Sequence, residues 1–425
     1  MNDGGGSIEL LRARLPGSED LVTLRAHDGR FIDPSSGPRP PETLDLDGGL
    51  VLPAFIEAHL HLDKALIGVG SASNLAEAIA ESAEYKRTMT REDLRTRARA
   101  VIEREVLAGT TLIRAHTDVD PVIGLLGIEV LLELRAELAD LVDLQIVAFP
   151  QEGVLRTPGT LSLLRAALEA GADVLGGCLY NEEDVARSRR QLDELLLLAA
   201  EYAVPLDLHA DLADDASDRR FLLAGYVAQR VLATGFPHRV TLGHVSSWAG
   251  LPPAELEALL ETVREAGIGV VALPATDMHL GGRRDTFAVR RGIAPVARIW
   301  AAGVACACAT NNVRNAFTPY GNADPLETAL FLAQTSHLSS SEELGRVLDS
   351  ITRTPAAMLG RTGYGTAPGD FADFVVLSSA DAAGAVLDRP DRLHVFKAGR
   401  RVAGTRRSSW IRRLDVDAPE ERTTA

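Results

Sequence analysis

Apolar runs of strand length alternate with amphipathic stretches of helical period through most of this chain. The strand-like runs lie near residues 50–57, 110–115, 142–149, 173–177, 204–208, 239–243, 268–273 and 303–309. Between them, segments such as Asp184–Tyr202 carry leucines at helical spacing. Eight strand–helix repeats indicate an α/β fold of the (β/α)8 TIM-barrel type. A doubly wound open sheet is the alternative, but the chain lacks the glycine-rich nucleotide turn that would favour it.

Both ends of the chain differ from this repeating middle. Ser7–Gly49 and Gly369–Gly404 each hold short strand patterns separated by turn signals such as Asp28-Gly29. We expect residues 1–49 and 365–405 to form one small composite β-sandwich domain beside a barrel over 50–364. Residues 406–425 are polar and charged, which predicts a loose tail.

The composition excludes several classes of protein. The 425 residues carry a formal net charge of −15, which argues against a nucleic-acid partner. No apolar run is long enough to span a membrane, and Met1–Leu15 lacks the pattern of a secretion signal. The three cysteines are too few for a disulfide framework. We therefore expect a cytoplasmic protein with a small-molecule substrate and no membrane or nucleic-acid partner; homo-oligomer formation stays open.

Polar residues follow the predicted strands where a barrel enzyme places its chemistry, at the carboxyl ends. In strand order these are His59, His61 and Lys64; His116 and Asp118; Gln151 and Glu152; His209 and Asp211; His244; Asp277 and His279; and Asn311 and Asn312. Five of the ten histidines thus close a strand. Random placement would scatter them, so the clustering predicts a single polar centre.

The His59-Leu60-His61 pair predicts a metal site. Side chains two apart on a strand point the same way, so both imidazoles can bind one ion. His209 supplies a third nitrogen, and three ligands with an open position suit a catalytic zinc or iron ion. For His116 and His279 a hydrogen-bonded wall residue is an equally good interpretation. Cys306 and Cys308 could also offer thiolates, although small buried residues are the commoner identity of such a pair.

Several segments resemble the amidohydrolase superfamily, specifically its cytosine deaminase-like branch. The similar segments are 52–64, 114–119, 148–153, 209–211, 243–244, 279–285 and 319–322, and the likeness covers nearly the whole chain. The resemblance implies one catalytic metal, held by His59, His61, His209 and the strand-eight position, Asn311. It implies hydrolysis of amino or amide C–N bonds in cyclic nitrogen compounds, with Gln151 and His244 binding the substrate or orienting the nucleophile. Lys64 is similar to a residue of members that remove alkylamines from hydroxylated triazines.

Two positions depart from the pattern of that branch. Asn311 stands where the family has an aspartate that binds the metal and accepts the proton of water. Leu212 stands where deaminases carry a proton-shuttling glutamate. An amide is a weaker ligand and a poor base, and leucine moves no proton. Asp211, Asp63 and Asp277 are the nearby acids that could replace them, and the sequence does not choose among the three.

These residues predict a metal-dependent hydrolase that cleaves a C–N bond of a small nitrogen heterocycle or cyclic amide. The expected catalytic residues are His244, Asn311, Asp211 and Lys64, and the expected substrate-binding residues are Gln151, Lys64, Asn312, His116 and His279. One alternative is a non-hydrolytic enzyme of the same fold, catalysing an elimination, isomerisation or cyclisation with a weakened or absent metal site. A second alternative is a ligand-binding pseudoenzyme.

Overall fold

Eight parallel strands form a barrel in this computed structural model, which describes residues 5–68, 70–215, 218–283, 285–287 and 289–408. The strands are β6 (Phe55–His61), β7 (Thr110–Asp118), β8 (Asp143–Phe149), β9 (Val174–Cys178), β10 (Leu206–Ala210), β11 (Val240–His244), β12 (Gly269–Ala272) and β13 (Cys306–Cys308). They pair in this sequence order. The predicted barrel is thereby confirmed.

The first and last strands of the barrel meet through the backbone of Asn311. Its N–H donates to the carbonyl of His59 over 2.8 Å, and its carbonyl accepts from the N–H of His61, also over 2.8 Å. A parallel bridge pairs Asn311 with Leu60. Because β13 is only three residues long, this contact beyond its end joins it to β6. It also fixes Asn311 beside the two histidines of β6.

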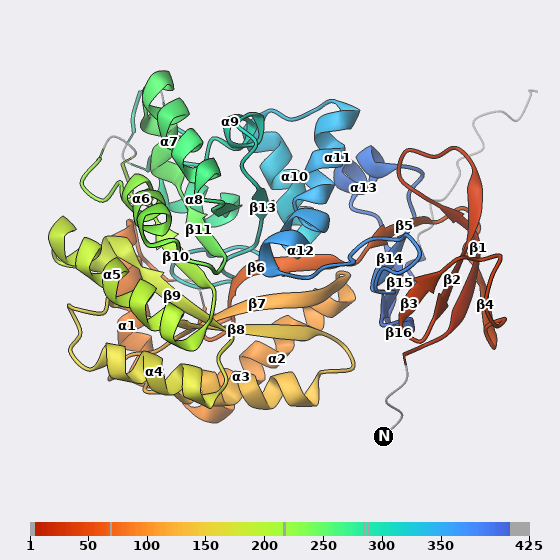
Figure 1. Ribbon diagram of the computed structural model, residues 1–425, viewed down its shortest axis with the longest axis horizontal. Coiled ribbons are helices and arrows are strands. Elements are labelled where there is room, and N and C mark those ends of the chain that lie inside the picture. Colours follow the sequence, from red (N-terminus) through yellow and green to blue (C-terminus); the bar gives the residue numbers. More distant parts are fainter. Residues whose placement is uncertain (1–4, 69, 216–217, 284, 288, 409–425) are drawn as a thin grey trace, which may run out of the picture.

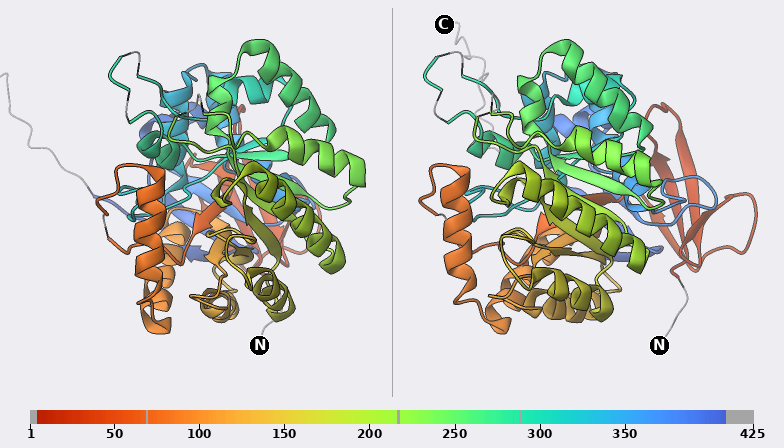
Figure 2. Two further views of the ribbon diagram at one scale, coloured as in Figure 1. Left: turned by 90° about the vertical axis from the view of Figure 1, so that its left-hand side faces the viewer. Right: turned by 60° about the vertical axis from the view of Figure 1, so that its left-hand side comes forward.

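Helices surround the barrel in the sequence order expected of alternating strands and helices (Figure 1, Figure 2). They are α1 (Leu75–Lys86), α2 (Arg91–Leu107), α3 (Leu126–Glu137), α4 (Thr160–Ala170), α5 (Val185–Tyr202), α6 (Ala224–Thr234), α7 (Pro253–Glu265), α8 (Pro274–Leu280), α9 (Val296–Ala301), α10 (Pro325–Ser336), α11 (Ser341–Asp349), α12 (Arg353–Leu359) and α13 (Ala382–Asp388), with 3-10 turns η1 (Leu179–Asn181) and η2 (Ser246–Gly250). Helix α5 matches its prediction closely: Asp184 caps its N-terminus and its leucine stripe is buried.

Strands from both ends of the chain form a separate mixed sheet at one side of the barrel (Figure 1). The strands are β1 (Ile8–Arg14), β2 (Leu21–His27), β3 (Arg30–Ile32), β4 (Glu42–Asp45), β5 (Leu50–Pro53), β14 (Phe374–Leu377), β15 (Arg392–Lys397) and β16 (Arg400–Ala403). The expectation of a small β unit built from both termini is confirmed. Most of the predicted tail, residues 409–425, lies outside the described residues.

The prediction of one strand over 50–57 is wrong, because this run forms β5 and β6 in different sheets. The pairing changes at Ala54. Its N–H donates to the carbonyl of Asp373 in the small-sheet region, whereas the N–H of Phe55 donates to Gly109 next to β7. The final run, 303–309, is likewise a strand only over β13. An unbroken apolar run does not reveal where its hydrogen-bonding partner changes.

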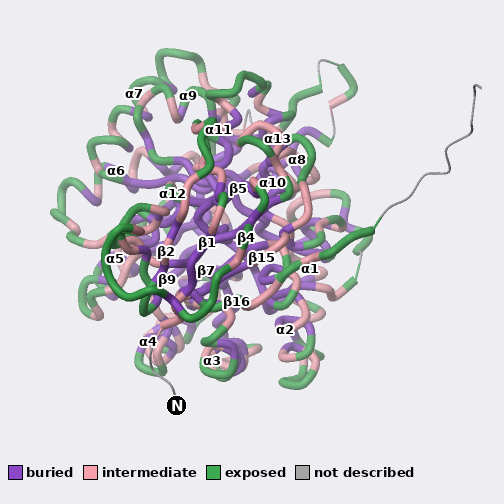
Figure 3. The backbone as a smooth tube through the Cα atoms, turned by 90° about the vertical axis from the view of Figure 1, so that its right-hand side faces the viewer, coloured by how far each residue is buried: buried purple, intermediate pink, exposed green. Residues whose placement is uncertain are grey.

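Burial follows the layers, with the strands inside and the outer helix surfaces exposed (Figure 3). Every residue of β6 and β7 is buried. Cys178, Cys306 and Cys308 are buried and unpaired, as small core residues are. Within the described segments, no helix is long and apolar enough to cross a membrane.

Candidate functional site

Three imidazoles converge at the carboxyl ends of β6 and β10. The Nε2 atom of His209 lies 3.2 Å from that of His59 and 3.0 Å from that of His61. Burial lowers the pKa of all three rings well below the ordinary histidine value, and neighbouring positive groups lower it further. The rings are therefore neutral at pH 7. Each can offer a nitrogen lone pair to a shared ligand.

This spacing fits a metal ion. Nitrogen atoms bound tetrahedrally to zinc stand about 3.3 Å apart, given its usual bond lengths to histidine. The Nδ1 atoms of His59, His61 and His209 find no hydrogen-bond partner in the described structure, so Nε2 carries the interaction. A neutral cluster of this kind binds a divalent ion without the repulsion that protonated imidazoles would cause.

A fourth imidazole, His116, stacks on His59 with ring centroids 3.9 Å apart. A nitrogen of His116 also lies within 4.8 Å of nitrogens of His59 and His209, so geometry alone offers a second triad. We favour His61 as the third ligand because its Nε2 lies 3.0 Å from that of His209. The Nε2 of His116 instead lies 3.1 Å from Asp207.

The buried carboxylate of Asp207 lies next to the histidine cluster, close to the rings of His59 and His116. Its carboxylate accepts hydrogen bonds from Arg114 over 2.8 Å and from Thr241 over 2.7 Å, besides its contact with His116. Burial alone would raise the pKa of Asp207, but His116 and Arg114 outweigh it and hold the pKa below its usual range. His116 thus contacts Asp207 beside the candidate metal ligands, and its predicted contact with substrate stays a prediction.

Asn311 lies next to the triad with an unused side chain. Both its Oδ1 and Nδ2 atoms are buried without a hydrogen-bond partner among the described residues. Its backbone adopts the left-handed region with φ 64°, which asparagine tolerates better than most residues. Leaving two buried polar atoms unpaired costs roughly 1–3 kcal/mol each. An orphan amide at this point indicates a ligand that these atoms contact.

Lys64 and Gln151 form a polar pair on another wall. The Lys64 ammonium donates to Gln151 Oε1 over 2.9 Å and to Asp118 over 2.7 Å. Asp118 also accepts from Lys86 at 2.7 Å, and Lys86 contacts Asp120 and Glu152. Burial would lower the pKa of Lys86, but these carboxylates outweigh it and raise the pKa. This network fixes the position of the Lys64 side chain in the cavity wall.

His244 closes β11 and lines the same cavity. Its Nδ1 lies 2.6 Å from Oδ1 of Asp277 on α8, and both side chains are buried. Burial raises the pKa of Asp277, whereas His244 lowers it, and the net shift is upward. The His244 backbone has φ 75°, an unusual conformation that marks the sharp end of the strand.

These groups enclose one small cavity with both polar and apolar lining residues. It is lined by His61, Lys64, Gln151, Tyr180, His209, Leu212, His244, Thr276, Leu280, Asn311, Asn312 and Phe317. The sequence analysis missed Tyr180, although reading the polar residues after each strand would have found it two positions beyond the end of β9. Tyr180 and Leu212 also line an outer cavity of about 570 Å³ beside α1. These two residues therefore separate the inner cavity from a wider approach.

The comparisons with known proteins agree with this geometry. The sequence profile of the amidohydrolase family matches residues 66–403. The chain belongs to the amidohydrolase family. N-isopropylammelide isopropyl amidohydrolase of Pseudomonas sp. (strain ADP) is 31% identical over 370 residues, covering 84% of this chain and 87% of that protein. Pterin deaminase of Rhizobium rhizogenes is 33% identical over 378 residues, covering 86% and 84%.

A solved structure gives the same result. The crystal structure of 5-methylcytosine deaminase from Klebsiella pneumoniae, liganded with 5-fluorocytosine, superposes with a TM-score of 0.88 at 30% identity. The match covers 95% of this chain and 99% of that one. The predicted superfamily, fold and enzyme class, a hydrolase of non-peptide C–N bonds, are thereby confirmed.

Within this amidohydrolase, the predicted acid Asp211 does not enter the cavity. Its two carboxylate oxygens accept hydrogen bonds from the N–H groups of Leu223 and Ala224, which begin α6, and from the indole of Trp248 over 2.7 Å. This set of donors makes Asp211 a structural link between β10, α6 and η2. Its predicted catalytic role stays a prediction that the geometry does not favour.

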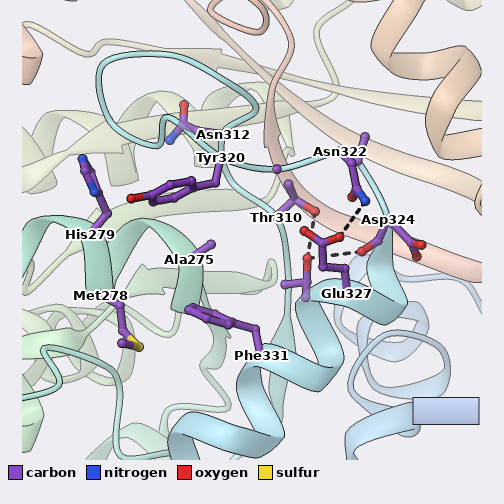
Figure 4. A pocket seen from close by; sticks show the side chains of 13 residues that line it. Ala275, Met278, His279, Thr310, Asn312, Tyr320, Asn322, Asp324, Glu327 and Phe331 are labelled. Carbon is purple, nitrogen blue, oxygen red and sulfur yellow. Dashed lines mark hydrogen bonds between the residues drawn. The ribbon is translucent and has the colours of Figure 1, made fainter. Parts of the chain in front are cut away.

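His279 lies in a different cavity from the three metal-ligand candidates (Figure 4). This cavity of about 480 Å³ lies between α8 and α10, and the imidazole of His279 meets the ring of Tyr320 edge-on there. Asn312 lines both cavities. The structure therefore brings most of the predicted site residues to one cavity, whereas His59, His116, Asp211 and His279 do not line it.

Proposed function

We propose that this amidohydrolase is a metal-dependent enzyme that hydrolyses a C–N bond of a small nitrogen heterocycle or cyclic amide, releasing ammonia or an amine. The observation that carries the proposal is the convergence of His59, His61 and His209 on one point at the edge of a cavity. Gln151, Lys64 and His244 line the same cavity. Metal ligands, ring-binding groups and a histidine for proton transfer thus surround one small space.

His59, His61 and His209 would hold the ion, with Asn311 as a neutral fourth ligand in place of the usual aspartate. Zinc or iron at such a site lowers the pKa of water and polarises the substrate. The neutral fourth ligand predicts weaker binding than in relatives that have a carboxylate there. The unpartnered amide of Asn311 supports this assignment because its oxygen has no other use in the described structure.

The remaining wall residues bind and orient the ring. Lys64 presents an ammonium group whose position Asp118 fixes, and it suits an oxo group or ring nitrogen that accepts hydrogen bonds. Gln151 and Asn312 add amide groups, while Leu212 and Phe317 cover the apolar face of a planar ring. The relatives named above are enzymes of an ammelide, a pterin and a methylcytosine. We infer a substrate of this general class, a ring with exocyclic nitrogen and oxygen substituents.

His244 moves the proton in this proposal. It faces the cavity from the end of β11 and can accept a proton from the attacking water and return it to the departing nitrogen. The attack forms a C–O bond at the trigonal ring carbon. Collapse of the adduct then breaks the C–N bond, and the nitrogen leaves as ammonia or an amine.

One observation favours the non-hydrolytic alternative. Among the described residues, no carboxylate lines the inner cavity. Asn311 and Leu212 occupy the two positions at which the family resemblance implies acids. A site with a lysine and histidines but no acid also suits an elimination or isomerisation of a bound ring.

Release of ammonia and amine from a panel of rings distinguishes the two functions. The panel contains cytosine, 5-methylcytosine, pterin and N-alkylated hydroxytriazines, assayed with metal-supplemented protein and with chelator. Hydrolysis predicts chelator-sensitive release of nitrogen with incorporation of ¹⁸O from labelled water. Consumption of a ring without nitrogen release or ¹⁸O incorporation would favour the alternative.

A further inference from the structure

Asp277 directly contacts a histidine that lines the inner cavity. It lies in α8, which begins at Pro274 just after β12, and its side chain is buried. One oxygen, Oδ1, lies 2.6 Å from Nδ1 of His244. The other, Oδ2, is buried without a hydrogen-bond partner in the described structure. In the described ranges, the ion pairs show no lysine or arginine on this carboxylate, so His244 is its cationic partner.

The carboxylates of the other nearby acids form hydrogen bonds or ion pairs with groups other than His244. Asp211 accepts from two backbone N–H groups and an indole, which leaves it facing away from the cavity. Asp63 accepts from the N–H of Asp118 over 2.8 Å, and its other carboxylate oxygen has no hydrogen-bond partner among the described residues, so it holds no cavity side chain. Asp118 holds two lysines. The choice among Asp211, Asp63 and Asp277, which the sequence left open, therefore falls on Asp277.

The His244–Asp277 contact fixes which ring nitrogen carries the proton. A carboxylate accepts a hydrogen bond from Nδ1–H, so the neutral imidazole in this contact has its lone pair on Nε2. The Nε2 of His244 is absent from the buried atoms that lack a partner, and the residue lines the cavity. The lone pair is thus available toward the place where the substrate would lie.

We propose that Asp277 is the positioning residue of this active site, holding His244 in the Nδ1–H form so that Nε2 serves as the proton carrier that Asn311 and Leu212 cannot be. The proposal rests on the proposed hydrolysis. Water gives a proton to Nε2 of His244 as its oxygen bonds to the ring carbon. The imidazolium then gives that proton to the leaving nitrogen as the C–N bond breaks. Asp277 stabilises the transient positive charge across the 2.6 Å contact.

This arrangement compensates for both departures from the family pattern. The family resemblance implies a proton path over two carboxylates, at the positions of Asn311 and Leu212. In this proposal His244, which lines the cavity, takes the proton. Its carboxylate partner, Asp277 of α8, does not line the cavity and contacts His244 from behind. The contact joins residues 33 positions apart on neighbouring strand ends, so only the folded chain brings them together.

The Asp277→Asn variant tests the proposal by two independent measurements. In histidine-labelled wild-type protein, ¹⁵N NMR should show His244 as the Nδ1–H tautomer with a strongly downfield proton, assigned by its loss in His244→Gln. The amide introduced by Asp277→Asn can donate to Nδ1 instead, so the tautomer should change or become mixed. For any ring that the wild type hydrolyses, kcat should fall about 100-fold or more. KM and metal content should stay within about threefold.

The matched control is Asp285→Asn, which makes the same chemical change in a carboxylate paired with Arg290 in the segment that follows α8. It should leave the His244 signal unchanged. If Asp277→Asn does not fold, Asp277→Ser, which also removes the carboxylate, replaces it.

An unchanged His244 tautomer in the Asp277 variant would overturn the proposal, and so would full kcat despite a changed tautomer. Failure of the wild type to hydrolyse any ring, together with an Asp277-dependent tautomer, would count against the proposed function while leaving the His244–Asp277 pairing intact.

Discussion

The ammonium group of Lys64 donates a hydrogen bond to the side-chain oxygen of Gln151 over 2.9 Å. That oxygen is therefore already occupied before a ligand binds, and the pair acts as one recognition element. Gln151 Nε2 reaches Sγ of Cys178 at only 3.7 Å, a weak contact that a better acceptor on a ring can replace. The pair thus offers a fixed cation beside an amide donor.

The first prediction is that Gln151→Leu weakens ligand binding without removing the fold or the metal. Loss of a hydrogen bond to a buried polar ligand is worth roughly 1–3 kcal/mol, so Kd or KM should rise about tenfold or more. Steady-state kinetics and calorimetric titration measure this. Gln229→Leu, the same change at an exposed position of α6 away from the cavity, is the control. A ligand-bound structure with Gln151 pointing away from the ring would contradict the assignment.

The second prediction concerns metal content. After expression with added zinc or iron, the protein should hold about one divalent ion per chain. His61→Ala removes one of three nitrogen ligands and should lower the occupancy after dialysis at least severalfold, as measured by elemental analysis. His238→Ala, at a histidine outside the cavity, should retain the ion. Wild-type protein that stays metal-free and active in chelator would favour the non-hydrolytic alternative.

The sequence was sufficient to predict the barrel and the gathering of histidines because both depend on local pattern. Strand period and helix period define the repeats, and parallel strands bring their carboxyl ends to one rim. His59, His61 and His209 are adjacent for that reason alone. The same rule applied to the fourth strand would have added Tyr180 to the predicted site.

Side-chain contacts that depend on tertiary packing could not be predicted from the sequence. Asp211 follows His209 by two residues and has the position of a catalytic acid, yet Trp248 and the start of α6 occupy its carboxylate. His279 follows Asp277 by two residues, yet it points into another cavity. The residues close to Asp211 and His279 in sequence do not reveal these two orientations, because the groups that contact each side chain lie more than ten positions away.

The third prediction concerns Glu105, a buried carboxyl of α2. Burial raises its pKa well above the usual glutamate value, and the nearby Glu57 raises it further. Its Oε2 accepts from Thr110, while Oε1 has no partner in the described structure. The folded state therefore binds this proton more tightly than the unfolded state. Its contribution to stability is complete below about pH 4.3 and is lost as pH rises toward the folded pKa.

Glu105→Gln removes this dependence because the amide stays neutral. Relative to wild type, its free energy of unfolding should increase by roughly 1–3 kcal/mol between pH 5 and pH 8. Urea unfolding at both pH values measures the difference. Glu103→Gln, at an exposed ion pair with Arg99, should show no such change. Parallel curves for Glu105→Gln and wild type would show that the carboxyl is ionised in the folded protein.

The fourth prediction concerns the two departures from the family. Asn311 and Leu212 both line the inner cavity, so a carboxylate at either position would face the metal ligands. The double variant Asn311→Asp, Leu212→Glu should raise metal occupancy, because a carboxylate binds a divalent ion better than an amide. Ammonia release from cytosine-like or triazine rings should also rise, since general acid–base groups contribute roughly 10²–10⁴-fold. Any reaction of the wild type that needs a neutral site should fall.

The two single variants separate the effects. Asn311→Asp should account for most of the gain in metal content, because backbone hydrogen bonds hold residue 311 beside His59 and His61. Leu212→Glu should change turnover more than metal content. Brisk ammonia release by the wild type on the same rings, with no gain in the double variant, would show that the carboxylates are dispensable here. In that case the His244–Asp277 pair already carries the proton at full rate, and the departures mark a replacement of the proton path rather than a loss of hydrolysis.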